Sequence, residues 1–421
     1  MRIGYPCITV GVPDANFRTC TEKYATEEHL LELIRLNLDA LERVITYNLS
    51  QGIQLFRIYS DLIPFGSSPV NRVPWAALFA ERFDQIGSLI RDGNMRVSMH
   101  PGQYTLLNTP RKDVLDRALL DLDYHDKVLT MLGVNQEHKI VLHIGGVYDD
   151  KKAALSRFVE QSRRLPERIR SRLVIENDER AFSIEDVLEI GSKHEIPVIF
   201  DNLHHQIHSG ANPEDLQEFH RWIQACRPTW KREDGPQKIH YSQQAEGKRM
   251  GTHSSTIRLA PFQKYASSYV TTDLDIMLEV KDKNLSALKC SNALLHRGGI
   301  SRLEQEWARY KYAVLERSPE RYQAIRVLLK DKEQYPVEVF YQLIEETLHL
   351  PIQSGHGVNA AQHVWGYFKD KTSERDKKEF EKRLERYQDG SGTLDSLKQL
   401  LLRLAEREEE TYLLESLYFY L

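Results

Sequence analysis

The sequence has little of what marks secreted, membrane-spanning or disulfide-stabilised proteins. Its 421 residues contain four cysteines, and none of them stands in a CxxC pair. A disulfide framework and a thiolate zinc site are therefore not expected. No run approaches about 18 consecutive apolar residues, and the N-terminus lacks the basic-then-apolar order of a signal peptide. These absences predict a cytoplasmic protein with no membrane partner.

The chain also lacks a strong excess of either charge. It carries 57 lysine and arginine residues against 61 aspartate and glutamate residues, with a sequence pI of about 6.5. Bulk electrostatic attraction to nucleic acid is therefore weak, so a nucleic-acid partner would need a local basic surface or a bound metal. No GxGxxG motif follows the first predicted strand, and no nucleotide cofactor is expected.

What the first 300 residues do contain is an alternation of short β-branched runs and longer amphipathic stretches. The predicted strands are Arg2–Pro6, Ile53–Ile58, Arg96–His100, Lys139–Ile144, Leu173–Asn177, Val198–Asn202, Lys238–Tyr241 and Asp275–Val280. Helical spacing lies between them, for example over 27–47, 76–91, 113–132 and 155–170. Eight strand-then-helix units in about 300 residues indicate an α/β fold, the (β/α)8 TIM barrel. A doubly wound open sheet is the alternative.

The last 121 residues follow a different pattern. They hold 19 basic and 22 acidic residues, a higher charge density than the preceding chain, and show helical spacing without alternating strands. The predicted helices cover 303–315, 321–329, 337–348, 360–368, 375–387 and 394–412. The glycine pair Gly298-Gly299 separates the two patterns. We therefore predict a barrel over 1–300 followed by a small all-α domain over 301–421.

Metal-ligand side chains stand at the end of one predicted strand after another. Strands three to eight end, in order, in His100, His143, Glu176, Asp201, His240 and Glu279. His204 follows three residues after the sixth strand's aspartate, and His253 lies in the loop after strand seven. The side chains at the C-terminal ends of barrel strands converge, so these groups should share one small volume. Converging carboxylates repel one another unless they are protonated or bound to cations.

This mixture of imidazole and carboxylate groups predicts bound divalent cations. The ligand types suit Mn²⁺, Zn²⁺ or Fe²⁺ better than Mg²⁺ or Ca²⁺. Mn²⁺ is the expected metal, with Zn²⁺, Fe²⁺ and Mg²⁺ as alternatives. The candidate ligands exceed what one ion can take, so we expect two or three ions per chain. Two ions about 3.5–4 Å apart would clamp the attacking and leaving oxygens of a phosphoryl displacement.

Longer motifs connect these strand ends to a known family. In chain order they are GYP (4–6), FRIYSDLIPF (56–65), HPGQY (100–104), LHIGG (142–146), IEND (175–178), DNLHH (201–205), KIHYS (238–242) and DIMLEVK (275–281). Together, over roughly 1–295, they resemble the UV damage endonucleases. The resemblance implies a metal-bearing barrel that cuts damaged double-stranded DNA immediately 5′ to UV photoproducts and leaves a 3′-hydroxyl, with abasic sites as a further substrate. It implies that the metal ligands are His100, His143, Glu176, Asp201, His204, His240, His253 and Glu279.

The resemblance also suggests individual roles. Glu176 and Asp201 would bridge metals, and Glu279 would hold the central ion. Lys238 stands two residues before His240 and should point to the same side of the strand, toward the scissile phosphate or the metals. A buried stem with a solvated amine is the alternative for this lysine. The expected catalytic residues are therefore Glu176, Glu279 and Lys238.

Other residues are expected to contact DNA. Gln103 and Tyr104 follow the Pro-Gly turn after strand three, which places an amide and an aromatic ring on a loop tip beside the metals. The alternative is that Tyr104 packs into the barrel mouth and Gln103 is solvated. Tyr5 and His205 are further expected DNA contacts. Basic residues that flank strand seven are expected to follow the phosphate backbone: Arg227, Lys231, Arg232, Lys248 and Arg249.

Two positions depart from the family's pattern. Ser68 stands where the family usually has a metal-ligand histidine, which affects one of the metal positions. Near the start, the family often has an asparagine a few residues after the tyrosine, whereas this chain reads Ile8-Thr9-Val10. A polar contact to the lesion is therefore expected to be lost or replaced.

Two other functions fit parts of this sequence. A barrel sugar isomerase or epimerase also holds divalent metals at strand ends, but such sites tend to be richer in carboxylates. A non-catalytic scaffold with a vestigial barrel is favoured only by Ser68, and the retained ligands weigh against it. Residues 303–421 resemble a small helical domain of unknown function that occurs alone or fused to repair proteins, and the sequence does not identify its partner or its chemistry.

Overall fold

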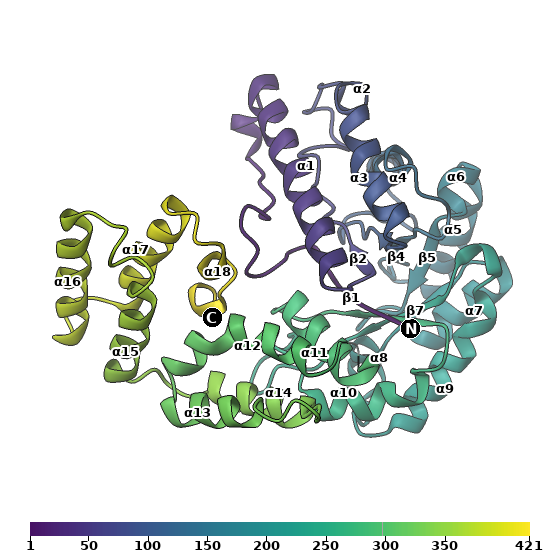
Figure 1. Ribbon diagram of the computed structural model, residues 1–421. Helices are drawn as coiled ribbons and strands as arrows, with labels where there is room; N and C mark the ends of the chain where they lie inside the picture. The colour runs from purple at the N-terminus through teal and green to yellow at the C-terminus, as the bar shows by residue number, and fades with distance from the viewer. Residues whose placement is uncertain (297) are drawn as a thin grey trace. The chain divides into compact units, whose positions relative to one another are not determined.

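Eight parallel strands form a nearly closed barrel, which confirms the predicted fold class (Figure 1). The computed structural model describes residues 1–296 and 298–421. The strands are β1 (Arg2–Pro6), β2 (Leu55–Arg57), β3 (Arg96–Ser98), β4 (Ile140–His143), β5 (Leu173–Glu176), β6 (Val198–Asp201), β7 (Gln237–Tyr241) and β8 (Leu274–Leu278). Each lies within or overlaps a strand predicted from the sequence.

The ring closes because the two ends of the barrel segment pair with each other. The strand order is β3-β2-β1-β8-β7-β6-β5-β4, and β1 pairs with β8 in parallel, with Arg2 opposite Asp275. An isolated parallel bridge between Met99 and Ile140 joins the two outer strands. Since all these strands run in one direction, their C-terminal ends open at the same side, here called the mouth.

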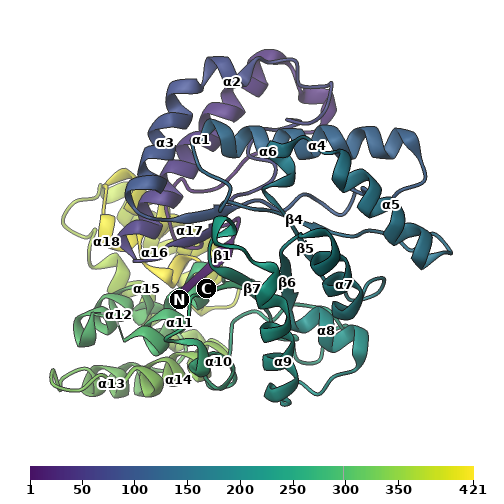
Figure 2. The same cartoon turned by 90° about the vertical axis from the view of Figure 1, so that its right-hand side faces the viewer.

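Helices alternate with the strands. Those of the barrel segment are α1 (Glu27–Ser50), α2 (Trp75–Leu78), α3 (Ala80–Asp92), α4 (Lys112–Met131), α5 (Lys151–Arg164), α6 (Glu167–Arg170), α7 (Ile184–His194), α8 (Asn202–Ser209), α9 (Leu216–Cys226), α10 (Leu259–Ala266) and α11 (Asn284–Leu295). Figure 2 shows α7 and α9 on the outer side of β5 and β6. The single helix predicted over 155–170 is two helices, because Pro166 has no backbone N–H to continue the ladder.

A buried ion pair closes the barrel interior at the end opposite the mouth. Arg96 on β3 and Asp275 on β8 are each 1% exposed, and Arg96 Nη1 lies 2.8 Å from Asp275 Oδ2. The same guanidinium donates to the backbone carbonyls of Glu137, Asp234 and Pro236. All three nitrogens of the guanidinium therefore have hydrogen-bond partners, as burial of a charge requires.

The chain divides into two compact units. The first comprises Met1–Thr9, Asp14–Ile257 and Lys264–Leu288. The second comprises Val10–Pro13, Arg258–Gln263 and Lys289–Leu421. The boundary expected at 300 lies inside the second unit, so the point at which the domains can be separated stays a prediction.

The second unit is helical. Its helices are α12 (Gly299–Leu315), α13 (Pro319–Leu328), α14 (Val337–Leu348), α15 (Ser354–Trp365), α16 (Glu374–Gln388), α17 (Leu394–Arg407) and α18 (Thr411–Leu414). Leucines at helical spacing on α17 enter a core that includes Phe368 and Phe380. The helix predicted over 394–412 ends early, because Glu409 takes the left-handed conformation with φ at 51°.

Among the helices of residues 1–296 and 298–421, none combines the length and the apolar character that crossing a membrane requires.

Candidate metal centre

The strand ends bring their polar side chains together in the mouth. His143, Glu176 and Asp201 are the last residues of β4, β5 and β6, and His240 is the fourth residue of β7. Residues just beyond β3 and β8 add His100 and Glu279. The parallel register sets them level, since His143 pairs with Glu176 and Asp201 pairs with His240.

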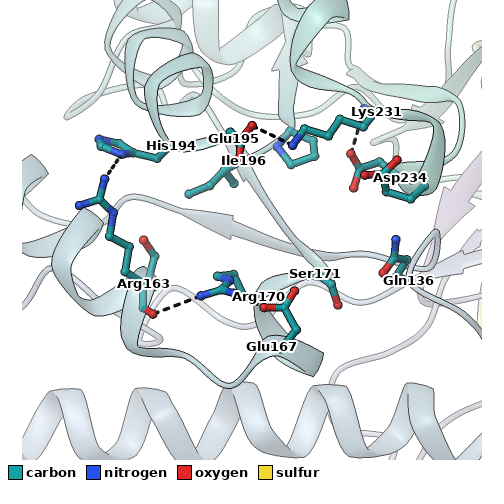
Figure 3. A pocket seen from close by; sticks show the side chains of 13 residues that line it. Gln136, Arg163, Glu167, Arg170, Ser171, His194, Glu195, Ile196, Lys231 and Asp234 are labelled. Carbon is teal, nitrogen blue, oxygen red and sulfur yellow. Dashed lines mark hydrogen bonds and ion pairs between the residues drawn. The ribbon is translucent and has the colours of Figure 1, made fainter.

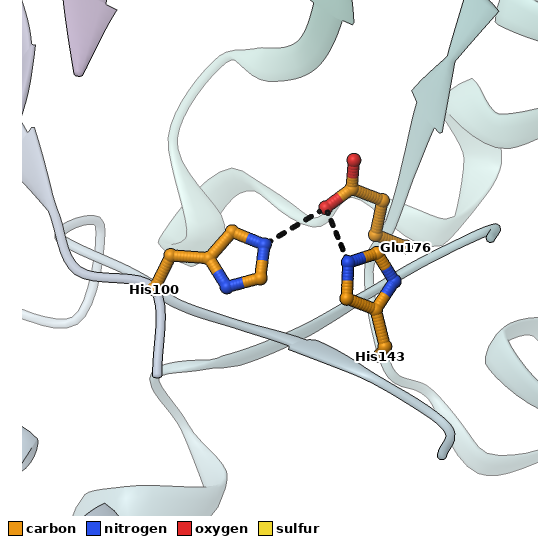
Figure 4. A group of neighbouring side chains, drawn as sticks. All are labelled: His100, His143 and Glu176. Carbon is orange, nitrogen blue, oxygen red and sulfur yellow. Dashed lines mark hydrogen bonds and ion pairs between the residues drawn. The ribbon is translucent and has the colours of Figure 1, made fainter. Parts of the chain in front are cut away.

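Glu176 is the hub of this cluster (Figure 4). Its Oε2 lies 3.1 Å from His100 Nε2 and 3.7 Å from His143 Nε2. Its Oε1 lies 2.7 Å from His240 Nδ1 and 3.7 Å from His204 Nδ1. The side chain is 1% exposed, so the imidazoles rather than water surround the carboxylate.

Two groups of three ligand-type residues share this glutamate. One is His100, His143 and Glu176, and the other is Glu176, Asp201 and His240. Within each group the potential ligand atoms lie within 4.8 Å of one another, a spacing that could hold a metal ion. Glu176 is the one residue that belongs to both groups.

The hydrogen bonds of two histidines fit cation binding. His100 Nδ1 lies 3.1 Å from the carbonyl oxygen of Pro101, and His204 Nδ1 lies 2.9 Å from that of Asn177. A neutral ring that donates its Nδ1–H to a carbonyl presents a lone pair at Nε2, which is the arrangement found in metal-ligating histidines. For His100 that lone pair would face a carboxylate oxygen, an unfavourable contact that a cation between them relieves.

Buried polar atoms without partners point the same way. Among the described residues, Asp201 Oδ2, His240 Nε2 and His143 Nδ1 are buried and make no hydrogen bond. An unpaired buried polar atom costs about 1–3 kcal/mol, so the free oxygen of Asp201, a member of the second group, indicates a missing partner, whereas the two ring nitrogens lie across their rings from Glu176. The donor types present, imidazole nitrogen and carboxylate oxygen, fit a divalent transition metal.

The electrostatics of the cluster favour an ionised Glu176, whereas burial raises the pKa of the Asp201 carboxyl. Burial opposes ionisation of Glu176, but the facing His240 and His143 hold the pKa of this carboxyl well below its usual range. Burial lowers the pKa of His100 to about 4, so this ring is neutral at pH 7. Burial also opposes the charge on His204, yet Asp201 and Glu176 raise its pKa to about 10. Glu176 therefore carries a negative charge at the centre of the cluster.

Comparison with known proteins identifies the family of the barrel. The UV-endonuclease UvdE family matches residues 1–311. The chain belongs to this family. The expected resemblance is thereby confirmed. A UV DNA damage endonuclease of Clostridium perfringens (strain 13 / Type A) is 38% identical over 386 residues, covering 91% of this chain and 92% of that protein.

Two further relatives agree. A UV DNA damage endonuclease of Bacillus cereus (strain Q1) is 31% identical over 314 residues, covering 72% of this chain and 97% of that protein. The crystal structure of SacUVDE is similar with a TM-score of 0.65 and 38% identity, covering 70% of this chain and 98% of that chain. Residues 311–421 match a separate family described only as a protein of unknown function, DUF1722.

Several predicted site residues of this UvdE-family chain lie outside the two groups of three. Glu279 neighbours the second group, because its Oε1 lies 3.4 Å from His240 Nδ1. His253 lies in the loop after β7, where it forms an isolated antiparallel bridge with Gln244. Lys238 is fully buried in the barrel, and its Nζ finds no hydrogen-bond partner in the described part of the chain. The solvated amine weighed from the sequence is therefore not observed.

Two residues expected to contact DNA are buried. Tyr5 is 0% exposed, and its hydroxyl donates to Asn48 Oδ1 at 2.7 Å and lies 2.7 Å from Thr9 Oγ1. His205 is 2% exposed, with Nε2 2.9 Å from Glu218 Oε1. Both side chains are buried and have hydrogen-bond partners within the protein, so they are not among the proposed DNA contacts.

Gln103 and Tyr104 are exposed on the loop after β3, and the Tyr104 ring is 79% exposed. The packing of Tyr104 into the mouth that was weighed from the sequence is therefore not observed. Ser68 lies in the loop after β2, where its Oγ accepts from the backbone N–H of Val70 at 3.3 Å.

The basic residues around strand seven lie at opposite ends of the barrel. Arg227, Lys231 and Arg232 precede β7 and therefore stand away from the mouth. A cavity of about 360 Å³ lies at that end (Figure 3). The charges lining it pair locally, as Lys231 does with Glu195 at 3.0 Å, so the cavity offers no cluster comparable to the one at the mouth. Lys248 and Arg249 follow β7 on the mouth side.

Reasoning from the sequence missed Arg57, the last residue of β2. Its Nη1 lies 2.6 Å from Glu279 Oε1, and both side chains are nearly buried. Burial opposes ionisation of Glu279, but the facing guanidinium of Arg57 lowers the pKa of its carboxyl. Arg57 therefore acts as a positioning residue that keeps this carboxylate charged and fixed.

Two asparagines that follow strand-end carboxylates were also missed. Asn177 bonds both backbone groups of Asp201, accepting from its N–H at 2.9 Å and donating to its carbonyl at 3.1 Å. Asn202 does the same for Ser242, at 2.8 and 2.9 Å. These amides connect the ends of β5, β6 and β7. The repeated pairs Glu176-Asn177 and Asp201-Asn202 were visible in the sequence as the signal.

We expect Arg57→Met to weaken the site without unfolding the barrel. Glu279 would lose its ion pair, and a buried carboxylate without a partner moves or takes up a proton. Metal affinity should fall about tenfold or more, measured by competition with a chelator of known affinity. Arg57→Lys, which keeps the positive charge but not the planar guanidinium, should show a smaller loss of metal affinity. Unchanged metal affinity in both variants would contradict the positioning role.

Proposed function

We propose that this chain is a metal-dependent endonuclease that cuts damaged double-stranded DNA immediately 5′ to UV photoproducts, with abasic sites as a second substrate. The observation that carries the proposal is the pair of ligand groups that share Glu176 in the mouth of the barrel. Membership of the UvdE family supports the substrate class. The curated relatives named UV DNA damage endonuclease support it further.

The residues proposed to hold the ions share the mouth and the strand ends. They are His100, His143, Glu176, Asp201, His204, His240, His253 and Glu279. When bound, two or three divalent ions, Mn²⁺ first among the candidates, would polarise a phosphoryl oxygen and lower the pKa of a water molecule. Glu176 would bridge, because each of its oxygens faces a different set of imidazoles.

The chain's own residues prepare the site in other ways. Pro101 and Asn177 carbonyls fix the ring orientations of His100 and His204. Glu279, held by Arg57, would complete the carboxylate set. Lys238 lies below the cluster inside the barrel, and burial holds the pKa of its amine well below the usual range. Because the side chain is fully buried, we propose that Lys238 contacts the metal site from inside the barrel and does not contact DNA.

The proposal is tested on purified protein of known metal content. Plasmid DNA, irradiated or not, is incubated with the metal-free protein and with protein reloaded with Mn²⁺, Zn²⁺ or Mg²⁺. We expect nicking only of irradiated plasmid, and only after the protein is reloaded with metal. An end-labelled duplex with one defined photoproduct should be cut at a single position, immediately 5′ to the photoproduct. Nicking by the metal-free protein, or turnover of an aldose panel in its place, would overturn the proposal.

Tyr104 is expected to contact the lesion. A damaged dinucleotide that leaves the base stack opens a gap, and stacking of an aromatic ring on a base contributes about 1–3 kcal/mol. Tyr104→Ala should therefore weaken binding to photoproduct-containing duplex by about tenfold, with metal content unchanged. Tyr104→Phe, which keeps the ring, should bind like the wild type. Equal losses on damaged and undamaged duplex would speak against lesion recognition.

Ser68→His should increase metal binding. The hydroxyl of Ser68 is a poor ligand for transition metals, whereas an imidazole in the same loop would add a donor. We expect higher metal stoichiometry or a tighter last ion in a calorimetric titration of the variant against wild type. Two superimposable titrations would mean that the loop after β2 does not approach the cluster.

A further inference from the structure

Two loops at the mouth carry the most exposed large apolar side chains among the described residues. Tyr104, 79% exposed, stands on the loop after β3, and Met250, 66% exposed, stands on the loop after β7. In the strand order, β3 and β7 are four steps apart in a ring of eight. Strands so related lie on opposite sides of a barrel, so the two loops flank the mouth from opposite sides.

The loop after β7 has a fixed backbone. Its residues 245–251 surround the side chain of Gln244, whose Oε1 accepts from the N–H of Gly251 at 2.8 Å. The Gln244 Nε2 donates to the carbonyls of Ala245 and Arg249, both at 3.0 Å. At the base of the loop, the N–H of Ala245 donates to the carbonyl of Thr252 at 2.7 Å. The loop therefore presents its outer side chains from a defined frame.

Those outer side chains are two cations and one thioether. Lys248, Arg249 and Met250 are consecutive and all exposed, and His253 of the proposed metal centre follows three residues later. Met250 therefore stands exposed between two cations and a residue of the proposed metal centre. Methionine is unbranched and polarizable and makes favourable contacts with aromatic rings, which include the faces of bases.

We propose that loop 245–251 is a second DNA-binding element, in which Met250 inserts at a base step across the mouth from Tyr104. Lys248 and Arg249 contact the phosphates that flank this step. Apolar wedges of this kind enter the minor groove and unstack one step, while adjacent basic side chains hold the backbone. Two wedges on opposite sides of the metal cluster would bend the duplex over it. The inference rests on the proposed endonuclease function.

The test uses the full-length, metal-loaded protein and a duplex with one photoproduct. A fluorescent adenine analogue, 2-aminopurine, is placed at successive steps on both sides of the lesion, since its emission rises when the base is unstacked. We expect one position outside the lesion to brighten on binding of wild type, and not of Met250→Ala. Affinity should fall about tenfold in Met250→Ala and be restored in Met250→Leu. Leu120→Ala, which removes an apolar side chain 54% exposed on α4, serves as the control.

The charges are tested by the salt dependence of binding. Lys248→Gln with Arg249→Gln should reduce the slope of log K against log salt by about 1.8, the value for two lost phosphate contacts on duplex DNA. The matched control is Arg164→Gln with Lys193→Gln, at the C-terminal ends of α5 and α7 and away from the mouth.

The outcomes separate the two proposals. Wild type that binds but never cuts photoproduct DNA would overturn the proposed function and with it this inference. Wild type that cuts, with a Met250→Ala variant that keeps both affinity and 2-aminopurine emission, would overturn the wedge alone. A slope of log K against log salt that stays unchanged in the double glutamine variant would overturn the phosphate contacts.

Discussion

Replacing Glu176 by glutamine should reduce nicking of irradiated DNA by at least about 100-fold, because displaced reacting groups alone cost that much. The two oxygens of this carboxylate face imidazoles of four histidines within 3.7 Å. An amide keeps the shape but offers one neutral oxygen in place of two charged ones. We expect metal content, measured by elemental analysis, to fall in the same variant.

The control for this experiment is Glu189→Gln, which removes an exposed carboxylate on α7. It should leave nicking, metal content and the circular dichroism spectrum unchanged. If Glu176→Gln keeps nearly full activity after chelation and reloading, the hub of the site lies elsewhere and the proposed ligand set is wrong.

The second large effect concerns stability. Arg96→Met should destabilise the barrel by about 3–5 kcal/mol, since it leaves the buried carboxylate of Asp275 without its main partner. Three backbone carbonyls lose their donor in the same change. Urea unfolding can be followed by tryptophan fluorescence, because the Trp230 ring lies 5.4 Å from the Arg96 guanidinium carbon.

The double variant Arg96→Met with Asp275→Leu removes both charges. It therefore shows how much of the loss in the single variant comes from leaving the Asp275 carboxylate buried without a partner. Replacement of a whole buried ion pair by apolar groups is often neutral, so most of the loss should be recovered. A single variant that costs less than about 1 kcal/mol would mean that Arg2, 3.8 Å from the other oxygen of Asp275, already compensates the charge.

Much of this architecture follows from local sequence patterns. The eight strands could be predicted because buried parallel strands read as short β-branched runs, and the cluster could be predicted because parallel strands end on one side. His100, His143 and Glu176 were placed together by that argument alone. Their convergence needs no knowledge of side-chain conformation.

What the sequence did not reveal depends on long-range pairing and on burial. Arg57 and Glu279 are 222 residues apart, so their ion pair exists only once the ring has closed. The burial of Tyr5 could not be predicted because both faces of β1 are buried, and alternation along such a strand carries no information. His205 has polar neighbours in sequence but aromatic ones in space, Phe200 and Phe219 among them.

The pairing of β1 with β8 has a consequence for how the protein is made. The ribosome releases β1 first, yet its partner on one side, β8, begins at Leu274. At about 5–20 residues per second, that strand edge waits for tens of seconds during translation. The segment Val10–Pro13, which belongs to the helical unit, waits longer still, for residues from Lys289 onward. A nascent chain with an unpaired edge is exposed to association with its neighbours, so we expect yield to depend on chaperones and on expression temperature.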